Sequence, residues 1–367
     1  MDLPVMPPVR PMLAKAVTGV PDPGKHTVAE ITGLSFEPKW DGFRCLVFKD
    51  GDEIELTSRN TKPLTRYFPE LVAAAREQLP ERCVLDGEIF VAIGPRLQFE
   101  VLQERIHPAE SRITMLSEKT PASFVAFDLL ALGDTSYVDR PFGERRAALE
   151  EALGGLDGPC YLTRTTEDPA LAEEWFHQFE GAGLDGVIAK PLGAPYVENG
   201  RTMMKVKHER TADVVVAGYR EHKTSTPERP LLGSLLLGLY ADGELQHVGV
   251  SASFTAARRA ELIEELQPLV CDISDHPWGK WQEWAIANPD RAPGTQSRWS
   301  AGKDLSFTPL RPERVLEVKY DAMEGRRFRH TAHFKRWRPD REPASCGYDQ
   351  LEQPVSYDLA SVLSGGE

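Results

Sequence analysis

The sequence predicts an α+β protein built from two domains. The chain has 367 residues, which is more than one compact core usually contains, and its 41% hydrophobic and 27% charged residues are typical of globular proteins. Segments with strand-like alternation recur along the whole length, separated by a few segments with helical spacing. After Lys207 the chain becomes polar and then rich in short strands, so we expect a hinge at residues 208–211.

The first domain is expected to hold antiparallel strands and three helices. Residues 34–38, 43–49 and 53–58 read as strands, and Asp50-Gly51 between the last two predicts a hairpin. Apolar runs bounded by polar turns predict four more strands, at residues 83–91, 123–130, 186–190 and 202–207. Apolar residues at helical spacing predict helices at residues 68–79, 140–153 and 169–180.

The second domain is expected to be a small five-stranded β-barrel with one helix. Its strands are predicted at residues 213–219, 233–240, 244–251, 315–320 and 328–334. Thr255 can cap a helix that runs to about residue 269. Residues 277–307, rich in Trp, Pro, Gly and Ser, predict a long loop, and the acidic tail predicts a loosely held extension. The expected boundaries are therefore 1–208, 209–345 and 346–367.

Charge alone argues against a nucleic-acid partner, because the net charge is −13. The distribution is uneven, however, and nucleic-acid binding depends on a local basic patch. Residues 311–341 contain ten bases and five acids, a local charge of +5. This segment predicts a phosphate-binding face, with an ordinary solvated surface as the alternative.

Cysteine usage and hydropathy indicate a cytoplasmic protein. The five cysteines are scattered, and none forms a Cys-x-x-Cys pair, so we expect reduced thiols and no structural zinc. No apolar run is long enough to cross a bilayer, and the first fifteen residues have no signal-peptide core. We therefore expect no membrane association.

A candidate nucleophile lies between the first two predicted strands, in Lys39-Trp40-Asp41-Gly42. A lysine attacks phosphorus only as the neutral amine, so burial or nearby cations must lower its pKa from an ordinary value of about 10.4. Gly42 would permit close approach of a ligand to the backbone. Average residue usage gives Lys-x-Asp-Gly in roughly one such chain in ten, so a surface turn is the better explanation of this segment by itself.

The surrounding sequence is more specific. From Glu37 to Arg44 the chain reads Glu-Pro-Lys-Trp-Asp-Gly-Phe-Arg, which resembles motif I of the covalent nucleotidyltransferases, the superfamily of DNA ligases, RNA ligases and mRNA capping enzymes. Further segments resemble motifs Ia, III, IIIa, IV, V and VI in the expected order, at residues 58–60, 85–88, 124–130, 185–190, 205–207 and 334–341. The resemblance implies a nucleotidyltransferase (adenylation) domain followed by an OB-fold barrel.

The resemblance also assigns roles to single residues. It implies that Lys39 attacks ATP and carries AMP as a phosphoramide. The implied nucleotide contacts are Glu37 to the adenine amino group, Phe127 to the adenine face, Glu88 to the ribose hydroxyls, and Arg44 and Arg59 to ribose and phosphate oxygens. Three lysines are expected to face one cleft and clamp the α-phosphate: Lys190, Lys205 and Lys207. Arg338 and Asp340 are expected to reach the β- and γ-phosphates when the second domain closes.

One position departs from the family pattern. Asp185 stands where these ligases usually have glutamate, and with Glu88 it is the expected ligand of Mg²⁺, with Mn²⁺ as a possible substitute. The shorter side chain leaves both direct and water-mediated coordination open.

Residues 311–320 and Pro11-Met12-Leu13-Ala14 resemble segments of bacterial ATP-dependent DNA ligases, above all the short stand-alone repair enzymes. This implies a monomer in the bacterial nucleoid that seals 5′-phosphate/3′-hydroxyl nicks in duplex DNA. A gap-filling polymerase and end-joining or excision-repair proteins are the implied partners. An RNA ligase, a capping-type enzyme and a non-catalytic protein on a decayed ligase fold are the alternatives. Glu37 argues against the capping enzyme, and Lys39 and the motif V lysines argue against the decayed fold.

Overall fold

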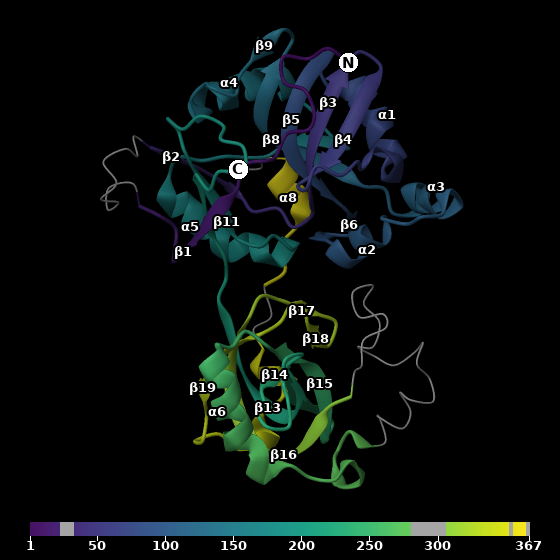
Figure 1. The fold of residues 1–367 in the computed structure, drawn as a ribbon. Helices are drawn as coiled ribbons and strands as arrows, with labels where there is room; N and C mark the ends of the chain where they lie inside the picture. Colours follow the sequence, from purple (N-terminus) through teal and green to yellow (C-terminus); the bar gives the residue numbers. More distant parts are fainter. Residues whose placement is uncertain (23–32, 280–305, 352–354, 365–367) are drawn as a thin grey trace. The chain divides into compact units, whose positions relative to one another are not determined.

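The computed structural model describes residues 1–22, 33–279, 306–351 and 355–364. The chain divides into two compact units (Figure 1). The first contains Met1–His208 and Pro354–Glu367, and the second contains Glu209–Gln353. The predicted α+β class is confirmed, because each unit combines β-sheet with helices.

A six-stranded sheet forms one half of the first unit. The main path runs β10 (Cys160–Leu162), β8 (Ser123–Leu132), β5 (Arg82–Phe90), β3 (Phe43–Asp50) and β4 (Glu53–Ser58), and β9 (Thr135–Ser136) pairs with β8. The predicted Asp50-Gly51 hairpin joins β3 to β4. The sheet is not wholly antiparallel as expected, because the short strand β10 pairs with β8 in parallel.

A four-stranded sheet forms the other half of this unit. Its order is β1 (Ala14–Val17), β12 (Met203–Val206), β11 (Val187–Pro191) and β2 (Leu34–Pro38). The sequence did not predict β1, which pairs in parallel with β12, while the other two pairings are antiparallel. A two-stranded ribbon, β6 (Ala92–Ile93) and β7 (Arg96–Leu97), lies apart from both sheets.

Helices α1 (Pro69–Gln78) and α4 (Phe142–Leu153) pack on the face of the six-stranded sheet that points away from the four-stranded one. Helix α5 (Pro169–Gln178) packs instead against β2 and β11 of the four-stranded sheet. Helix α3 (Glu110–Lys119) contacts α1, and α2 (Phe99–Glu104) precedes it in the chain. Helices α1 and α4 pack their apolar residues into one core with β3, β5 and β8. Proline occupies the first turn of α1 and of α5, where its missing N–H has no intrahelical partner to lose. The sequence did not predict α2 and α3.

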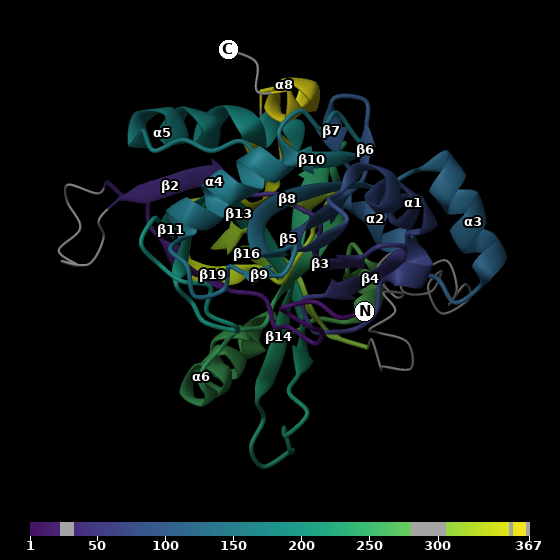
Figure 2. The same cartoon turned by 90° about the horizontal axis from the view of Figure 1, so that it is seen from above.

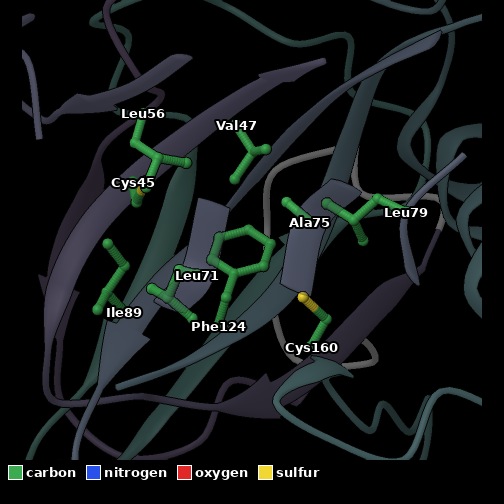
Figure 3. A pocket seen from close by; sticks show the side chains of 9 residues that line it. All are labelled: Cys45, Val47, Leu56, Leu71, Ala75, Leu79, Ile89, Phe124 and Cys160. Carbon is green, nitrogen blue, oxygen red and sulfur yellow. The ribbon is translucent and has the colours of Figure 1, made fainter. Parts of the chain in front are cut away.

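Figure 3 shows the interior between α1 and the sheet, lined by nine apolar or sulfur-containing side chains, among them Cys45, Phe124 and Cys160. The cavity there measures about 10 Å³, no more than a single water requires. It is therefore a packing gap in the core and not a ligand site.

Four of the five cysteines are buried free thiols, and Cys271 is half-buried.

The C-terminal tail is not the loose extension that its composition suggested, because residues 346–351 pack in the second unit and residues 355–364 belong to the first. Helix α8 (Leu359–Leu363) lies beside the end of α5 (Figure 2). Its Leu359 and Val362, one helical turn apart, are buried in a core with Trp175. The Asp358 carboxylate caps the helix by accepting from the Ala360 N–H.

The second unit contains a five-stranded antiparallel sheet, as predicted. Its order is β15 (Glu244–Ser251), β14 (Leu232–Ala241), β13 (Arg210–Glu221), β16 (Thr308–Tyr320) and β19 (His333–Trp337). A ribbon of β17 (Met323–Glu324) and β18 (Arg327–Phe328) accompanies it. Thr255 caps α6 (Ala256–Leu266) as predicted.

The expected barrel is incomplete among the described residues. Within the described ranges, an isolated bridge between Ser251 and Ala332 links the two edges of the sheet, and no ladder closes it. Most of the predicted 277–307 loop lies outside the described residues. In the part of the chain that the structure describes, no helix combines the length and apolar character needed to cross a bilayer.

Candidate active site

A cavity of about 250 Å³ is lined from both sheets of the first unit. Most of the predicted nucleotide-binding residues line it. The lining residues are Pro11, Met12, Leu13, Ala14, Glu37, Pro38, Lys39, Trp40, Arg44, Arg59, Glu88, Phe127, Ile188, Arg201, Met203 and Lys205. Strand periodicity and register produce this convergence, because residues directly opposite each other on paired strands point to the same face.

Two rows of side chains show this effect. In the four-stranded sheet, Lys205, Ile188 and Glu37 lie opposite one another on β12, β11 and β2. In the six-stranded sheet, Arg44 on β3 lies opposite Glu88 on β5. The cavity therefore has a basic end at Lys205 and an acidic end at Glu37.

The backbone fixes Lys39 immediately after β2. The Lys39 N–H donates to Gly186 O at 2.8 Å, and the Lys39 carbonyl accepts from Asp185 N at 2.9 Å. Gly42 must be glycine, because a Cβ there would lie 2.0 Å from Ile89 O. The Gly42 N–H donates to Glu88 Oε1 at 3.2 Å, which ties the lysine loop to β5.

The Asp185 carboxylate is shared by two lysines. Its Oδ2 lies 2.7 Å from Lys39 Nζ and 2.7 Å from Lys207 Nζ. Burial alone would raise the pKa of Asp185, but the two ammonium charges outweigh burial and lower this pKa to about 2. Burial and the charges of Lys207 and Lys39 lower the pKa of Lys205.

Glu37 presents an unused acceptor. Its Oε1 lies 2.9 Å from Lys190 Nζ, whereas Oε2 is buried and has no hydrogen-bond partner among the described residues. Burial raises the pKa of Glu37, and the Lys190 charge opposes that shift. A buried acceptor without a partner is costly, so this oxygen suits a ligand that donates a hydrogen bond.

Lys190 does not face the cavity beside Lys205, which corrects one expectation. Its side chain is only 2% exposed, and Nζ donates to Phe127 O at 2.8 Å besides pairing with Glu37. Nζ also lies 4.7 Å from the ring centroids of Phe127 and Phe142. Lys190 thus supports Glu37 from beneath the cavity.

Glu88 combines burial with nearby positive charge. Burial raises its pKa to about 7, against the opposing effects of Arg44 and Lys39. At neutral pH this carboxyl is therefore only partly ionised, unlike Asp185.

Among the residues that the structure describes, no cluster of three His, Cys, Asp or Glu side chains could hold a metal ion. A metal here would need oxygens from the substrate or water.

Asp86 and Tyr196 support the site from behind the cavity lining, and both were missed from the sequence. The Arg44 guanidinium donates to both Asp86 oxygens, at 2.5 and 2.6 Å, and lies 4.6 Å from the Phe127 ring centroid. The Tyr196 hydroxyl donates to Asp86 Oδ2 at 2.6 Å. Asp86 lies inside the motif III segment, two residues before Glu88. Because alternate residues of a strand share a face, Glu88 could have indicated that Asp86 lies on the same face. Nothing local singled out Tyr196.

Two exposed arginines, Arg59 and Arg201, also line the cavity. Arg59 was predicted from motif Ia. Arg201 was not predicted, and its place in a polar turn before β12 carries no signal of its own. Both guanidinium groups are suitable partners for phosphate oxygens.

Arg338 and Asp340 lie in the second unit. Arg338 donates to Asp213 at 2.9 and 3.0 Å and to Asp340 at 2.9 Å. The hydrogen bond from Arg338 lowers the pKa of Asp340 to about 2. Several bases of the 311–341 segment also pair with acids of this unit, namely Arg311 with Glu313, Arg314 with Glu265, Arg336 with Glu317 and Lys319 with Glu209. The basic face is thus partly neutralised.

Comparison with known proteins identifies the family of this chain. Residues 11–207 match the ATP dependent DNA ligase domain, and residues 228–341 match the ATP dependent DNA ligase C terminal region. The chain is 57% identical to DNA ligase C of Mycobacterium tuberculosis, over 100% of this chain and 99% of that protein. It is 58% identical to DNA ligase C2 of Mycolicibacterium smegmatis, over 96% and 97%.

A solved structure from a study of Lig E DNA ligases shares the fold at 19% identity, with a TM-score of 0.53, covering 89% of this chain and 99% of that one. The predicted resemblance is therefore confirmed along nearly the whole chain. By these matches, the chain belongs to the family of ATP-dependent DNA ligases.

Proposed function

We propose that this protein seals 5′-phosphate/3′-hydroxyl nicks in duplex DNA through an adenylate carried on Lys39. One observation carries the proposal: Lys39 Nζ lies at a nucleotide-sized cavity, held 2.7 Å from Asp185, with a buried orphan acceptor on Glu37 in the same cavity. Membership of the ATP-dependent DNA ligase family supports the substrate and the cofactor.

Lys39 Nζ, once deprotonated, attacks the α-phosphorus of ATP. A P–N bond forms, the P–O bond to pyrophosphate breaks, and pyrophosphate leaves. AMP then passes to the 5′-phosphate, and the 3′-hydroxyl displaces it. Asp185, with a pKa of about 2, is too weak a base to take the lysine proton, so its role is to position Nζ. Lys205 and Lys207 supply positive charge beside the phosphate that is attacked.

Glu37 and its supporting lysine make the base pocket selective. The free Oε2 can accept a hydrogen bond from the exocyclic amino group of adenine. Guanine carries a carbonyl oxygen at that position. This oxygen and the Glu37 carboxylate are both acceptors, so no hydrogen bond could form between them. This argument favours ATP over GTP and disfavours a capping-type reaction.

We assign Mg²⁺, or Mn²⁺ in its place, to Asp185. Its carboxylate offers the hard oxygen donors that such a cation takes, and Glu88 is the second proposed ligand. When bound, the cation would offset phosphate charge. Glu88 is assigned to the ribose hydroxyls, Arg44 and Arg59 to ribose and phosphate oxygens, and Phe127 to the adenine face. Arg338 and Asp340 are assigned to the leaving pyrophosphate.

The proposed setting is DNA repair in the bacterial nucleoid, in the cytoplasm, by a monomer. The 57% identity to a protein named DNA ligase C supports this setting. A gap-filling polymerase and end-joining or excision-repair proteins are the proposed partners. Sealing of nicked RNA is the second candidate activity, because RNA ligases share the adenylation chemistry.

The deciding experiment incubates the protein with Mg²⁺ and ATP, GTP or NAD, each labelled in the adenylate or guanylate phosphate. The proposal predicts label that survives denaturation with ATP only, and none on Lys39→Ala. Matched nicked DNA and nicked RNA duplexes then identify the polymer that is sealed. Retention of label from GTP, or faster sealing of RNA, would refute the proposal in its present form.

A further inference from the structure

A buried hydroxyl connects two parts of the nucleotide cavity's lining. One part is the strap, which we define as residues 10–14 and of which Pro11 to Ala14 line the cavity, and the other is Arg44 with Phe127. We propose that Tyr196 is a positioning residue for ATP, which sets nucleotide affinity by holding the strap and the Arg44 guanidinium in register. This inference rests on the proposed function of the same cavity.

The Tyr196 hydroxyl makes one hydrogen bond to the strap and one to the carboxylate that holds Arg44. It donates to Asp86 Oδ2 at 2.6 Å and accepts from the Met12 N–H at 3.1 Å. Tyr196 is 4% exposed and Asp86 is 0% exposed, so water does not compete for either bond. Burial and the neighbouring Asp86 charge raise the pKa of Tyr196 well above its ordinary value, which keeps the donating proton on the oxygen.

Asp86 passes this constraint to Arg44. Its two oxygens receive Arg44 Nε and Nη2 in a fork, which is the geometry that fixes a guanidinium most firmly. Arg44 Nη2 also donates to Met12 O at 3.3 Å. Both backbone polar groups of Met12 are therefore hydrogen-bonded, the N–H to Tyr196 and the carbonyl oxygen to Arg44.

The strap has further anchors, which explains why losing one hydroxyl should loosen it and not release it. Leu13 N donates to Gly200 O at 2.7 Å, and Arg10 N donates to Glu198 Oε2 at 2.9 Å. These bonds lie on either side of Met12. Tyr196 itself is absent from the cavity lining, so it acts on the nucleotide only through Met12 and Arg44.

Tyr196→Phe keeps the ring and removes only the hydroxyl. It leaves the Met12 N–H without its acceptor and Asp86 with one donor fewer, next to the bound nucleotide. We expect the KM for ATP in self-adenylation to rise about tenfold, the effect of roughly 1.4 kcal/mol, while kcat at saturating ATP stays within twofold. Tyr137→Phe, which removes a hydroxyl from the same unit, is the matched control and should leave KM unchanged.

Asp86→Asn provides a second route to the same network and should also raise the KM for ATP. Because both side chains act through Arg44 and the strap, the increase in KM in the double variant should be smaller than the product of the increases in the two single variants. Should Tyr196→Phe fail to fold, Asp86→Asn decides alone, and an unchanged KM overturns the inference.

A merely structural hydroxyl gives a different pattern: a lower thermal midpoint with an unchanged KM, and that result would overturn the inference. Failure of the proposed function is distinguishable, because wild-type protein would then take no stable label from ATP. If the wild-type protein is labelled and both variants have an unchanged KM, the positioning role of Tyr196 is refuted and the proposed function stands.

Discussion

Replacing Asp185 with asparagine removes a negative charge that lies 2.7 Å from two lysine ammonium groups. The pKa of Asp185 falls from its ordinary 3.8 to about 2 in the folded protein, and each pKa unit corresponds to about 1.4 kcal/mol. The charged carboxylate therefore stabilises the first unit by about 2 kcal/mol at neutral pH. For a domain of roughly 150–250 residues this predicts a thermal midpoint lower by about 4–8 °C.

The stabilisation by the Asp185 carboxylate should decrease as the pH falls. The depressed pKa means that the unfolded chain takes up the proton first as pH falls, so the contribution is complete above about pH 4 and disappears toward pH 2. Urea unfolding of wild type and Asp185→Asn should show a constant difference from pH 5 to 7 that shrinks below pH 4. Asp52→Asn removes an exposed partner of Arg76 and should change stability by under about 0.5 kcal/mol. A difference that is absent at pH 7, or that grows on acidification, would refute the reasoning.

Three further predictions address the nucleophile, the second unit and the tail. Lys39→Ala should lose both the stable label from ATP and nick sealing from ATP, and sealing that persists would exclude an adenylate on this lysine. Arg338→Ala should slow self-adenylation at least tenfold while sealing of pre-adenylated nicks stays within a few-fold, and equal loss in both assays would contradict its assignment to pyrophosphate. Leu359→Ala should lower the unfolding free energy of the first unit by about 2–4 kcal/mol, because it empties a buried site of the core. Ser361→Ala on the exposed side of the same helix is its control, and an equal effect of both would show that the tail does not depend on this packing.

Local sequence was sufficient for much of the fold. Alternating residues and turn signals predicted β3 and β4 with their Asp50-Gly51 hairpin, and Thr255 predicted the start of α6. The shorter elements that were missed have a common cause. Short elements such as β1, β10 and α2 have too few residues to show a period, and partners distant in the chain stabilise them.

The candidate site divides in the same way. Local sequence identified the candidate nucleophile, the order of the motifs and the candidate nucleotide contacts, because motif spacing and strand alternation are local properties. The partners of these groups became known only from the fold. It placed Lys190 under Glu37, Asp185 between Lys39 and Lys207, and Tyr196 against Asp86. The reason is physical: strand register and chain crossings bring together side chains far apart in sequence, and burial at those meetings sets their charges and hydrogen bonds.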